Sequence, residues 1–146
     1  MDKKDLINLI SDTFCPVGFK HKGNYWMLRE IELTKMINLQ KSNFGNYFYI
    51  NYGFILNKLD RDGLVAHVFE RLASNDKEEQ TNLTNCLNLD YEILEQKRIS
   101  ILKKLMNDKV LKKIQGVSSE LELVEYIKKR PQMNDIPLSV KKYLNL

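Results

Sequence analysis

Five uncharged polar side chains flank one turn in the segment from Met36 to Leu56, and they recur at alternate positions. Alternation of this kind places side chains on one face of a pair of strands. Tyrosine offers rigid contact area and carboxamides offer adaptable hydrogen bonds, so the pattern favours a surface that recognises a protein partner. The side chains are Asn38, Gln40, Tyr47, Tyr49 and Asn51. An ordinary solvated sheet face is the simpler alternative.

Arg29 is the cation that we expect at the edge of this polar face. It lies on the strand predicted just before the segment, on the side that continues the tyrosines and amides. A guanidinium among amides and phenols suits a carboxylate or another anion, although stacking on a neighbouring tyrosine would be a purely structural role. If the face is hollowed into a pocket, it would instead suit a small ligand or an uncharacterised enzyme.

Catalytic and metal-binding motifs are absent from the sequence. The two histidines, His21 and His67, and the two cysteines, Cys15 and Cys86, lack the spacing of a zinc site or a nucleophile motif. No glycine-rich phosphate loop is present. We expect two free thiols, with Cys15 buried at a helix end and Cys86 in a polar segment. The sequence therefore predicts no catalytic residue, no metal site and no cofactor.

A loop over Asn43–Asn46 would fix the register of the two strands that carry the polar set. One face is then apolar and needs a cover, whereas the other carries the amides and phenols. The apolar face pairs Lys41 with Phe48, Leu39 with Ile50, and Ile37 with Tyr52. The polar face pairs Ser42 with Tyr47, Gln40 with Tyr49, and Asn38 with Asn51.

The remaining strands extend this hairpin into an antiparallel meander. The sequence predicts strands at Tyr25–Glu30, Leu33–Ser42 and Tyr47–Leu56, after a short extended piece or loop at Phe19–Lys22. Residues 64–72 fit either a fourth strand or a short helix. The expected class is therefore α+β, with an antiparallel sheet of three to four strands and with the N-terminal and C-terminal helices covering one face.

Helical periodicity marks both ends of the chain. A first helix spans Asp2–Phe14, with Asp2 as its cap. Later segments are a loop or weak helix at Ala73–Leu89, a long amphipathic stretch at Asp90–Ile114, a helix from Ser119 to Lys129 and a last short helix from Pro137. We expect Asp90 to cap the long stretch and Asn107-Asp108 to break it. Residues 1–146 are predicted to form one domain, with a sheet-bearing part at 1–72 and a mainly helical part at 73–146.

Composition and charge narrow the classes of function. A hydrophobic content of 43% with 29% charged residues is typical of a globular chain, and no apolar run approaches the length of about 20 residues that a membrane span needs. The charged N-terminus lacks the features of a signal peptide, so a cytoplasmic location without membrane contact is expected. Oligomeric state is not indicated.

The positive charge is concentrated in the last third of the chain. Residues 91–146 contain 12 Lys and Arg against 7 Asp and Glu, whereas residues 1–90 contain 11 against 12. This imbalance suits nucleic acid, an acidic protein or an ordinary solvated helix face. For nucleic acid, the expected phosphate contacts are Lys103, Lys104, Lys112 and Lys113.

Three motifs in the first half resemble a bacterial family called domain of unknown function 4304. They are GFKHKG at Gly18–Gly23, NLQKS at Asn38–Ser42 and YIN at Tyr49–Asn51, and His67–Leu72 resembles the next recurring element. The resemblance implies an α+β domain of the bacterial cytoplasm and brings no established enzyme activity. By analogy with small immunity proteins of toxin systems, it favours a non-catalytic, protein-binding role.

Overall fold

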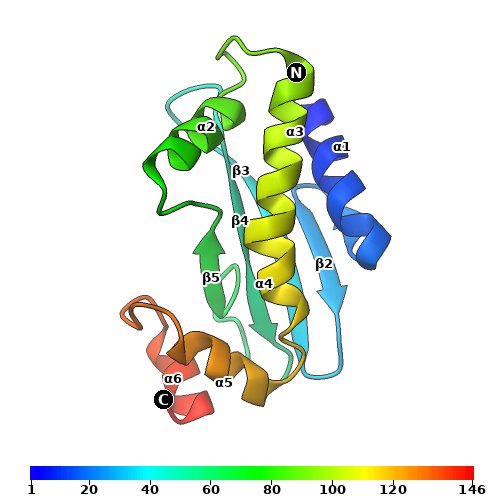
Figure 1. The fold of residues 1–146 in the computed structure, drawn as a ribbon. Coiled ribbons are helices and arrows are strands. Elements are labelled where there is room, and N and C mark those ends of the chain that lie inside the picture. Colours follow the sequence, from blue (N-terminus) through cyan, green and yellow to red (C-terminus); the bar gives the residue numbers. More distant parts are fainter.

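Five antiparallel strands form one open sheet in which each strand pairs with the next along the chain (Figure 1). The computed structural model describes residues 1–146. The strands are β1 (Lys20–Lys22), β2 (Tyr25–Arg29), β3 (Leu33–Lys41), β4 (Phe48–Leu56) and β5 (Val68–Arg71). The predicted α+β class and meander are confirmed. The strand number is five rather than three to four, because the short piece before residue 23 and part of segment 64–72 both pair with the sheet.

The central hairpin has the predicted register. Leu39 pairs with Ile50 and Asn38 with Asn51, and the Ser42 amide donates to the Tyr47 carbonyl at 2.9 Å to close the loop. Every predicted pair along β3 and β4 is present. Register is well determined here because a shift by one residue would turn the apolar side chains toward solvent.

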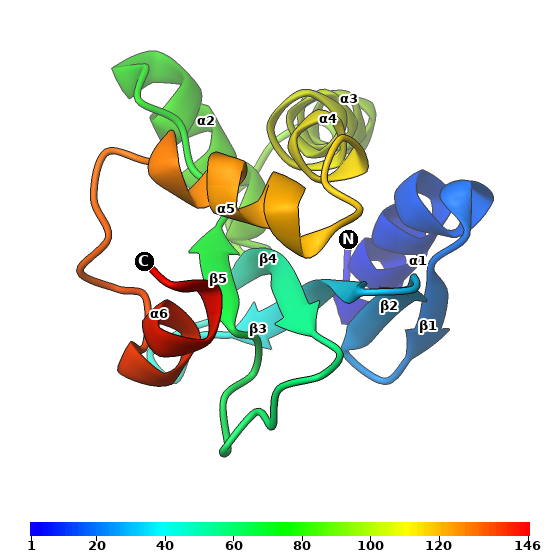
Figure 2. The same cartoon turned by 90° about the horizontal axis from the view of Figure 1, so that it is seen from below.

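All but one of the helices lie on one side of the sheet, and α6 packs beside its lower end (Figures 1 and 2). α1 lies beside α3, and α5 and α6 close the end at which β4 stops and β5 begins. Beyond the other face, Figure 2 shows the connection 57–67 and, on the same side, α6. The helices are α1 (Lys3–Phe14), α2 (Lys77–Leu87), α3 (Glu95–Leu105), α4 (Lys112–Gln115), α5 (Glu120–Lys128) and α6 (Leu138–Leu144), with a 3₁₀ turn at Cys15–Val17 and a π-helical segment at Met106–Leu111.

Several helix boundaries differ from the sequence prediction. Asp90 does not cap α3, whose N-cap is Leu94 with a side chain 79% exposed. Asn107-Asp108 does not break the helix, because the backbone continues through the π-helical segment. The segment predicted as loop or weak helix contains the three-turn helix α2, which begins at an Asp76 cap. Ser119, the first residue of the helix predicted there, is the N-cap of α5, since its hydroxyl accepts from the Glu122 amide.

The burial of the two cysteines is the reverse of the expectation. Cys15 is exposed, because the chain turns away from the core after Phe14, and Cys86 is fully buried on α2. Burial raises the pKa of the Cys86 thiol. A protonated, buried thiol is a poor nucleophile, so Cys86 packs as a small apolar side chain.

The core lies between the helices and the apolar sheet face. A cluster of 29 buried side chains includes Trp26, Ile37 and Phe54 from the strands and Leu102 and Ile127 from the helices. Both the sheet-bearing part and the helical part contribute to this cluster. The helices that pack on the apolar side therefore also hold the polar face of the sheet in position.

Glu70 joins β5 to the C-terminal helices. The Tyr126 hydroxyl donates to its carboxylate, and the Arg130 guanidinium pairs with it at 3.7 Å. Burial raises the pKa of Glu70, and nearby Arg130 and Lys113 oppose part of that rise. Because the carboxyl is easier to protonate in the folded state than in the unfolded chain, its contribution to stability decreases as pH rises through this raised pKa.

We therefore expect a pH-dependent difference between the wild type and Glu70→Gln. As pH rises from about 4, near the ordinary carboxyl pKa, the free energy of unfolding of the wild type should fall relative to that of the variant, and then level off. Urea unfolding of both proteins from pH 4 to pH 8 measures this difference, with exposed Glu92→Gln as a control. A difference that is constant or that grows in the opposite direction would disprove the assignment.

Candidate functional site

The strand side chains on the open face of the sheet combine amides, aromatic rings and cations without a carboxylate. Side chains that pair directly across antiparallel strands share a face. On this face the strands supply four cations, Lys20, Lys22, Arg29 and Arg71, and no Asp or Glu. Gln40, Phe69 and Arg71 are exposed, and Tyr25, Met27, Asn38, Tyr49 and Ile55 are half-buried. The predicted polar face therefore exists, and no helix covers Gln40 and Arg71, whereas Pro137 at the start of α6 borders Phe69 at the edge of the face.

Arg71 and three amides form a connected network at the centre of this face. The Arg71 Nε donates to Asn51 Oδ1 and its Nη2 donates to Gln40 Oε1, both at 3.0 Å. The Asn51 amide donates to Asn38 Oδ1 at 3.0 Å and to Gln40 Oε1 at 2.9 Å. The network spans β3, β4 and β5, because Asn38, Asn51 and Arg71 occupy one row of paired residues. We call these four residues the Arg71 network.

The Arg71 guanidinium is held in place while part of it stays free. Its carbon lies 3.9 Å from the centre of the Tyr49 ring, an arrangement in which the ring face attracts the cation. Arg71 belongs to none of the ion pairs in the structure. Of the five N–H donors of a guanidinium, the network uses two, so the edge between Nη1 and Nη2 can still bind a carboxylate through two hydrogen bonds.

Arg29 lies on the predicted face but not in the network. It sits four residues along β2 from Tyr25, the partner of Asn38, which is a separation of roughly 13 Å. There it borders a groove of about 530 Å³ that also contains Asp60 and Arg61 of the connection 57–67. The sequence analysis placed Arg29 among the amides, and this prediction is wrong: the arginine that contacts them is Arg71, on β5.

The other predicted face residues divide into contact and support positions. Gln40 is exposed, and Tyr47 and Tyr49 are half-buried with their rings edge to face at 5.8 Å. Asn51 is fully buried beneath its partners, so it positions Arg71 rather than contacting anything beyond the domain. Phe69, which the sequence analysis missed, adds a ring 37% exposed to the same face.

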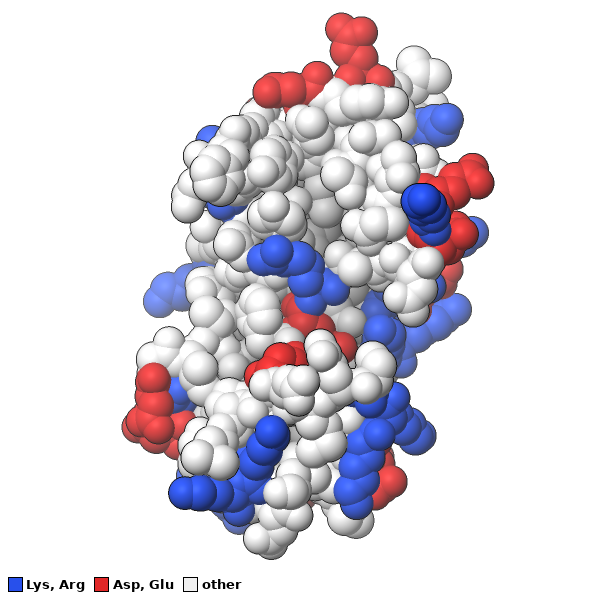
Figure 3. Space-filling view, turned by 90° about the vertical axis from the view of Figure 1, so that its left-hand side faces the viewer, with Lys and Arg blue, Asp and Glu red and all other residues white.

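The lysines predicted to bind nucleic acid have mixed surroundings. Lys112 pairs with Asp108 at 3.3 Å, and Lys113 donates to the Tyr52 hydroxyl at 3.4 Å. Lys104 borders a hollow with Asp76, Glu78 and Glu79. Figure 3, which faces α2 and β5, shows basic side chains in separate groups with acidic ones between them. Nucleic-acid binding stays a prediction that a gel shift at low and high salt tests.

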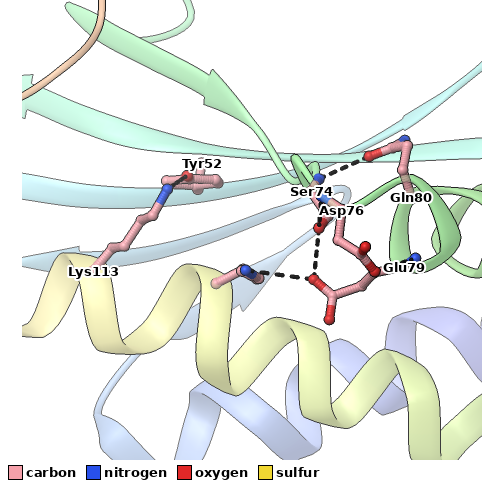
Figure 4. Close-up of polar contacts among 7 residues, drawn as sticks. Tyr52, Ser74, Asp76, Glu79, Gln80 and Lys113 are labelled. Carbon is pink, nitrogen blue, oxygen red and sulfur yellow. Dashed lines mark hydrogen bonds and ion pairs between the residues drawn. The ribbon is translucent and has the colours of Figure 1, made fainter.

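A second polar group ties α2 to the π-helical segment (Figure 4). The Ser74 hydroxyl donates to Glu79 at 2.7 Å, and Lys109 pairs with the same carboxylate at 3.4 Å. The Ser74 hydrogen bond and the Lys109 charge hold the pKa of Glu79 below its ordinary value. These contacts of Glu79 fix α2 beside the end of β5.

Burial and the Glu70 charge raise the pKa of Tyr52, whose phenol therefore stays protonated.

Removing the buried amide should loosen Arg71 without unfolding the domain. In Asn51→Leu, Arg71 Nε and the Asn38 and Gln40 oxygens lose a partner while the number of side-chain heavy atoms is kept, at a cost of about 1 to 3 kcal/mol. We expect the side-chain Nε–H resonance of Arg71 to move to a solvent-averaged position and its exchange with water to accelerate. Asn8→Leu, at an exposed position of α1, is the control. An unchanged Arg71 resonance would contradict the network.

Comparison with known proteins gives one match. A family model described as a domain of unknown function, DUF4304, matches residues 10–116. The matched range begins within α1 and ends just after α4, so it includes the whole sheet and the Arg71 network, whereas α5 and α6 fall outside it. Neither a curated protein nor a solved structure matches the chain. No helix reaches the length and apolarity required to cross a bilayer.

Proposed function

We propose that this chain, which belongs to the DUF4304 family, is a non-catalytic domain that binds an acidic protein partner on its open sheet face. The observation that carries the proposal is the state of Arg71, which is oriented by neutral amides and has no carboxylate counter-charge. A partner carboxylate would complete its hydrogen bonding. Neutralisation of a toxin, as by an immunity protein, is one form that such binding would take.

Preorganisation of Arg71 supports this function. An arginine side chain normally loses much conformational freedom on binding, and this loss weakens affinity. Here the Tyr49 ring and two amide oxygens have already fixed the guanidinium. Arginine and tyrosine are also the residue types in which binding energy concentrates at protein interfaces. The exposed Phe69 ring, two residues along β5 from Arg71, offers apolar area next to the charge.

Charge selects the kind of partner. Because the strands place four cations and no carboxylate on the open face, a basic surface would be repelled and an acidic one attracted. The attraction is screened by salt beyond about 10 Å at 0.1 M ionic strength. We therefore expect the association rate with the partner to fall as salt concentration rises.

Affinity capture from the native host, followed by binding measurements with the purified partner, tests the proposal. Wild type and Arg71→Glu are used as baits, and any protein recovered only by the wild type is produced separately. Its dissociation constant is then measured by calorimetry against wild type, Arg71→Gln and the double variant Tyr47→Ala/Tyr49→Ala. We expect at least a tenfold weaker affinity for both variants.

Lys103→Gln is the matched control, because it removes one exposed positive charge from α3, on the opposite side of the sheet. It should bind the partner as the wild type does. If every purified partner binds Arg71→Gln and the tyrosine double variant with unchanged affinity, the open face is not the docking surface.

A further inference from the structure

A cavity beside Arg71 is large enough to receive a side chain of the bound partner. It has a volume of about 160 Å³ and lies between the start of β4, the end of β5 and α2. Its floor consists of side chains that are at most 5% exposed, namely Phe48, Leu72, Leu83 and Leu87. Its rim is more polar and consists of Tyr47, Tyr49 and Arg71 from the strands, with Ala73, Gln80 and Thr84 from the following segment and α2.

The size and lining of the cavity suit one apolar side chain. An apolar cavity of about 150 Å³ is large enough for a benzene ring, so this one accommodates a leucine or phenylalanine side chain. Burying such a side chain contributes favourable free energy in proportion to its apolar area. The floor offers no polar group for a buried charge, which excludes a charged side chain from the interior.

Arg71 requires a carboxylate close to that apolar side chain, since the same arginine borders the cavity and carries the free N–H edge. Neighbouring side chains of an extended peptide point to opposite sides, and those two positions apart are separated by about 7 Å. At a chain terminus, however, the carboxylate and the last side chain are attached to one α carbon. β4, β5 and α2 flank the cavity. A bound polypeptide that ends at this site does not have to continue past them, whereas an internal segment would.

We infer that this site captures the C-terminal carboxylate of a polypeptide whose last side chain is apolar, with the carboxylate on Arg71 and the side chain in the cavity. This inference rests on the proposed function and specifies the partner element that anchors it. Tyr49 keeps the guanidinium in place, and the cavity floor selects against polar terminal residues.

Nuclear magnetic resonance titration with short peptides tests the inference. The probe is N-acetyl-Gly-Gly-Leu with a free carboxylate, and the comparison peptides are its C-terminal amide and N-acetyl-Gly-Gly-Gly. We expect saturable shifts at Tyr49, Arg71, Leu83 and Thr84 with a dissociation constant near 1 mM, and at least tenfold weaker binding of both comparison peptides. Arg71→Gln and Thr84→Phe, which places a ring toward the cavity, should each weaken binding at least tenfold.

Three results would overturn the inference. If the probe causes no saturable shift up to 10 mM, the site does not exist. If the amide or the glycine peptide binds as tightly as the probe, the site does not require both a carboxylate and an apolar side chain. Binding of 4-methylpentanoate as tight as that of the peptide shows that the site takes small carboxylates instead of chain ends. If a purified partner nevertheless binds more weakly to Arg71→Gln than to the wild type, the open face is still its docking surface. Only the inference that a C-terminal carboxylate is recognised is then wrong. A spectrum of each variant alone shows whether it is folded, so that weaker peptide binding is not mistaken for unfolding.

Discussion

Arg98→Met should unfold at a far lower urea concentration than the wild type. Arg98 is 4% exposed, and its guanidinium donates to the carbonyl oxygens of Cys86 at 2.6 Å, Asn88 at 3.1 Å and Tyr91 at 2.6 Å. These carbonyls end α2 and form the connection to α3, so the cation also suits the negative end of the α2 dipole. Leaving several buried acceptors without donors costs about 4 kcal/mol.

Chemical unfolding followed by circular dichroism measures the loss, which should also lower the thermal midpoint by roughly 10 °C. Lys97→Met is the matched control, because it replaces the neighbouring exposed cation by the same residue and should change stability by about 0.5 kcal/mol or less. A similar stability of Arg98→Met and Lys97→Met would show that the carbonyls find other donors.

Gly53→Ala should destabilise the sheet by about 3 kcal/mol and displace β5. An added Cβ at Gly53 would stand 2.0 Å from the Val68 carbonyl oxygen, a backbone atom that cannot move without β5. Gly53 pairs with Phe69, two residues before Arg71, so the shift would reach the Arg71 network. Partner binding should therefore weaken even in the fraction of protein that stays folded.

Urea unfolding and the Arg71 Nε–H resonance check both parts of this expectation. Gly116→Ala is the control, since a Cβ there meets nothing within 4 Å and the backbone φ of −81° accepts alanine. Its stability should stay the same or rise by a few tenths of a kcal/mol. If Gly53→Ala were as stable as Gly116→Ala, the close approach of β5 to β4 would be refuted.

The central hairpin could be predicted from sequence because two independent signals agree there. The Asn- and Gly-containing loop sets its length, and the segregation of Leu39 and Ile50 from Asn38 and Asn51 sets its register. Each signal alone would leave alternatives, but together they define every pair. Two of the motifs that carry the family resemblance lie on the same strands, and the match to the DUF4304 model confirms the resemblance.

The identity of the site arginine could not be predicted in this way. β5 has four residues and follows the long connection 57–67, so neither periodicity nor turn length determines its register. Its position depends on the missing side chain of Gly53 and on Glu70 contacts with helices far along the chain. Arg29 precedes the hairpin directly and was therefore the nearer candidate. The π-helical segment had no recognisable signal in sequence either.

The footprint of the purified partner on the isotope-labelled domain distinguishes the open sheet face from the helical side as the docking surface. We expect the largest changes on binding at the side-chain N–H groups of Arg71, Gln40 and Asn38 and at the Phe69 ring. The exposed faces of α3 and α5, represented by Lys103 and Leu121, should stay unchanged. A footprint on those helices, with the Arg71 resonances unmoved, would show that the partner does not bind the open face.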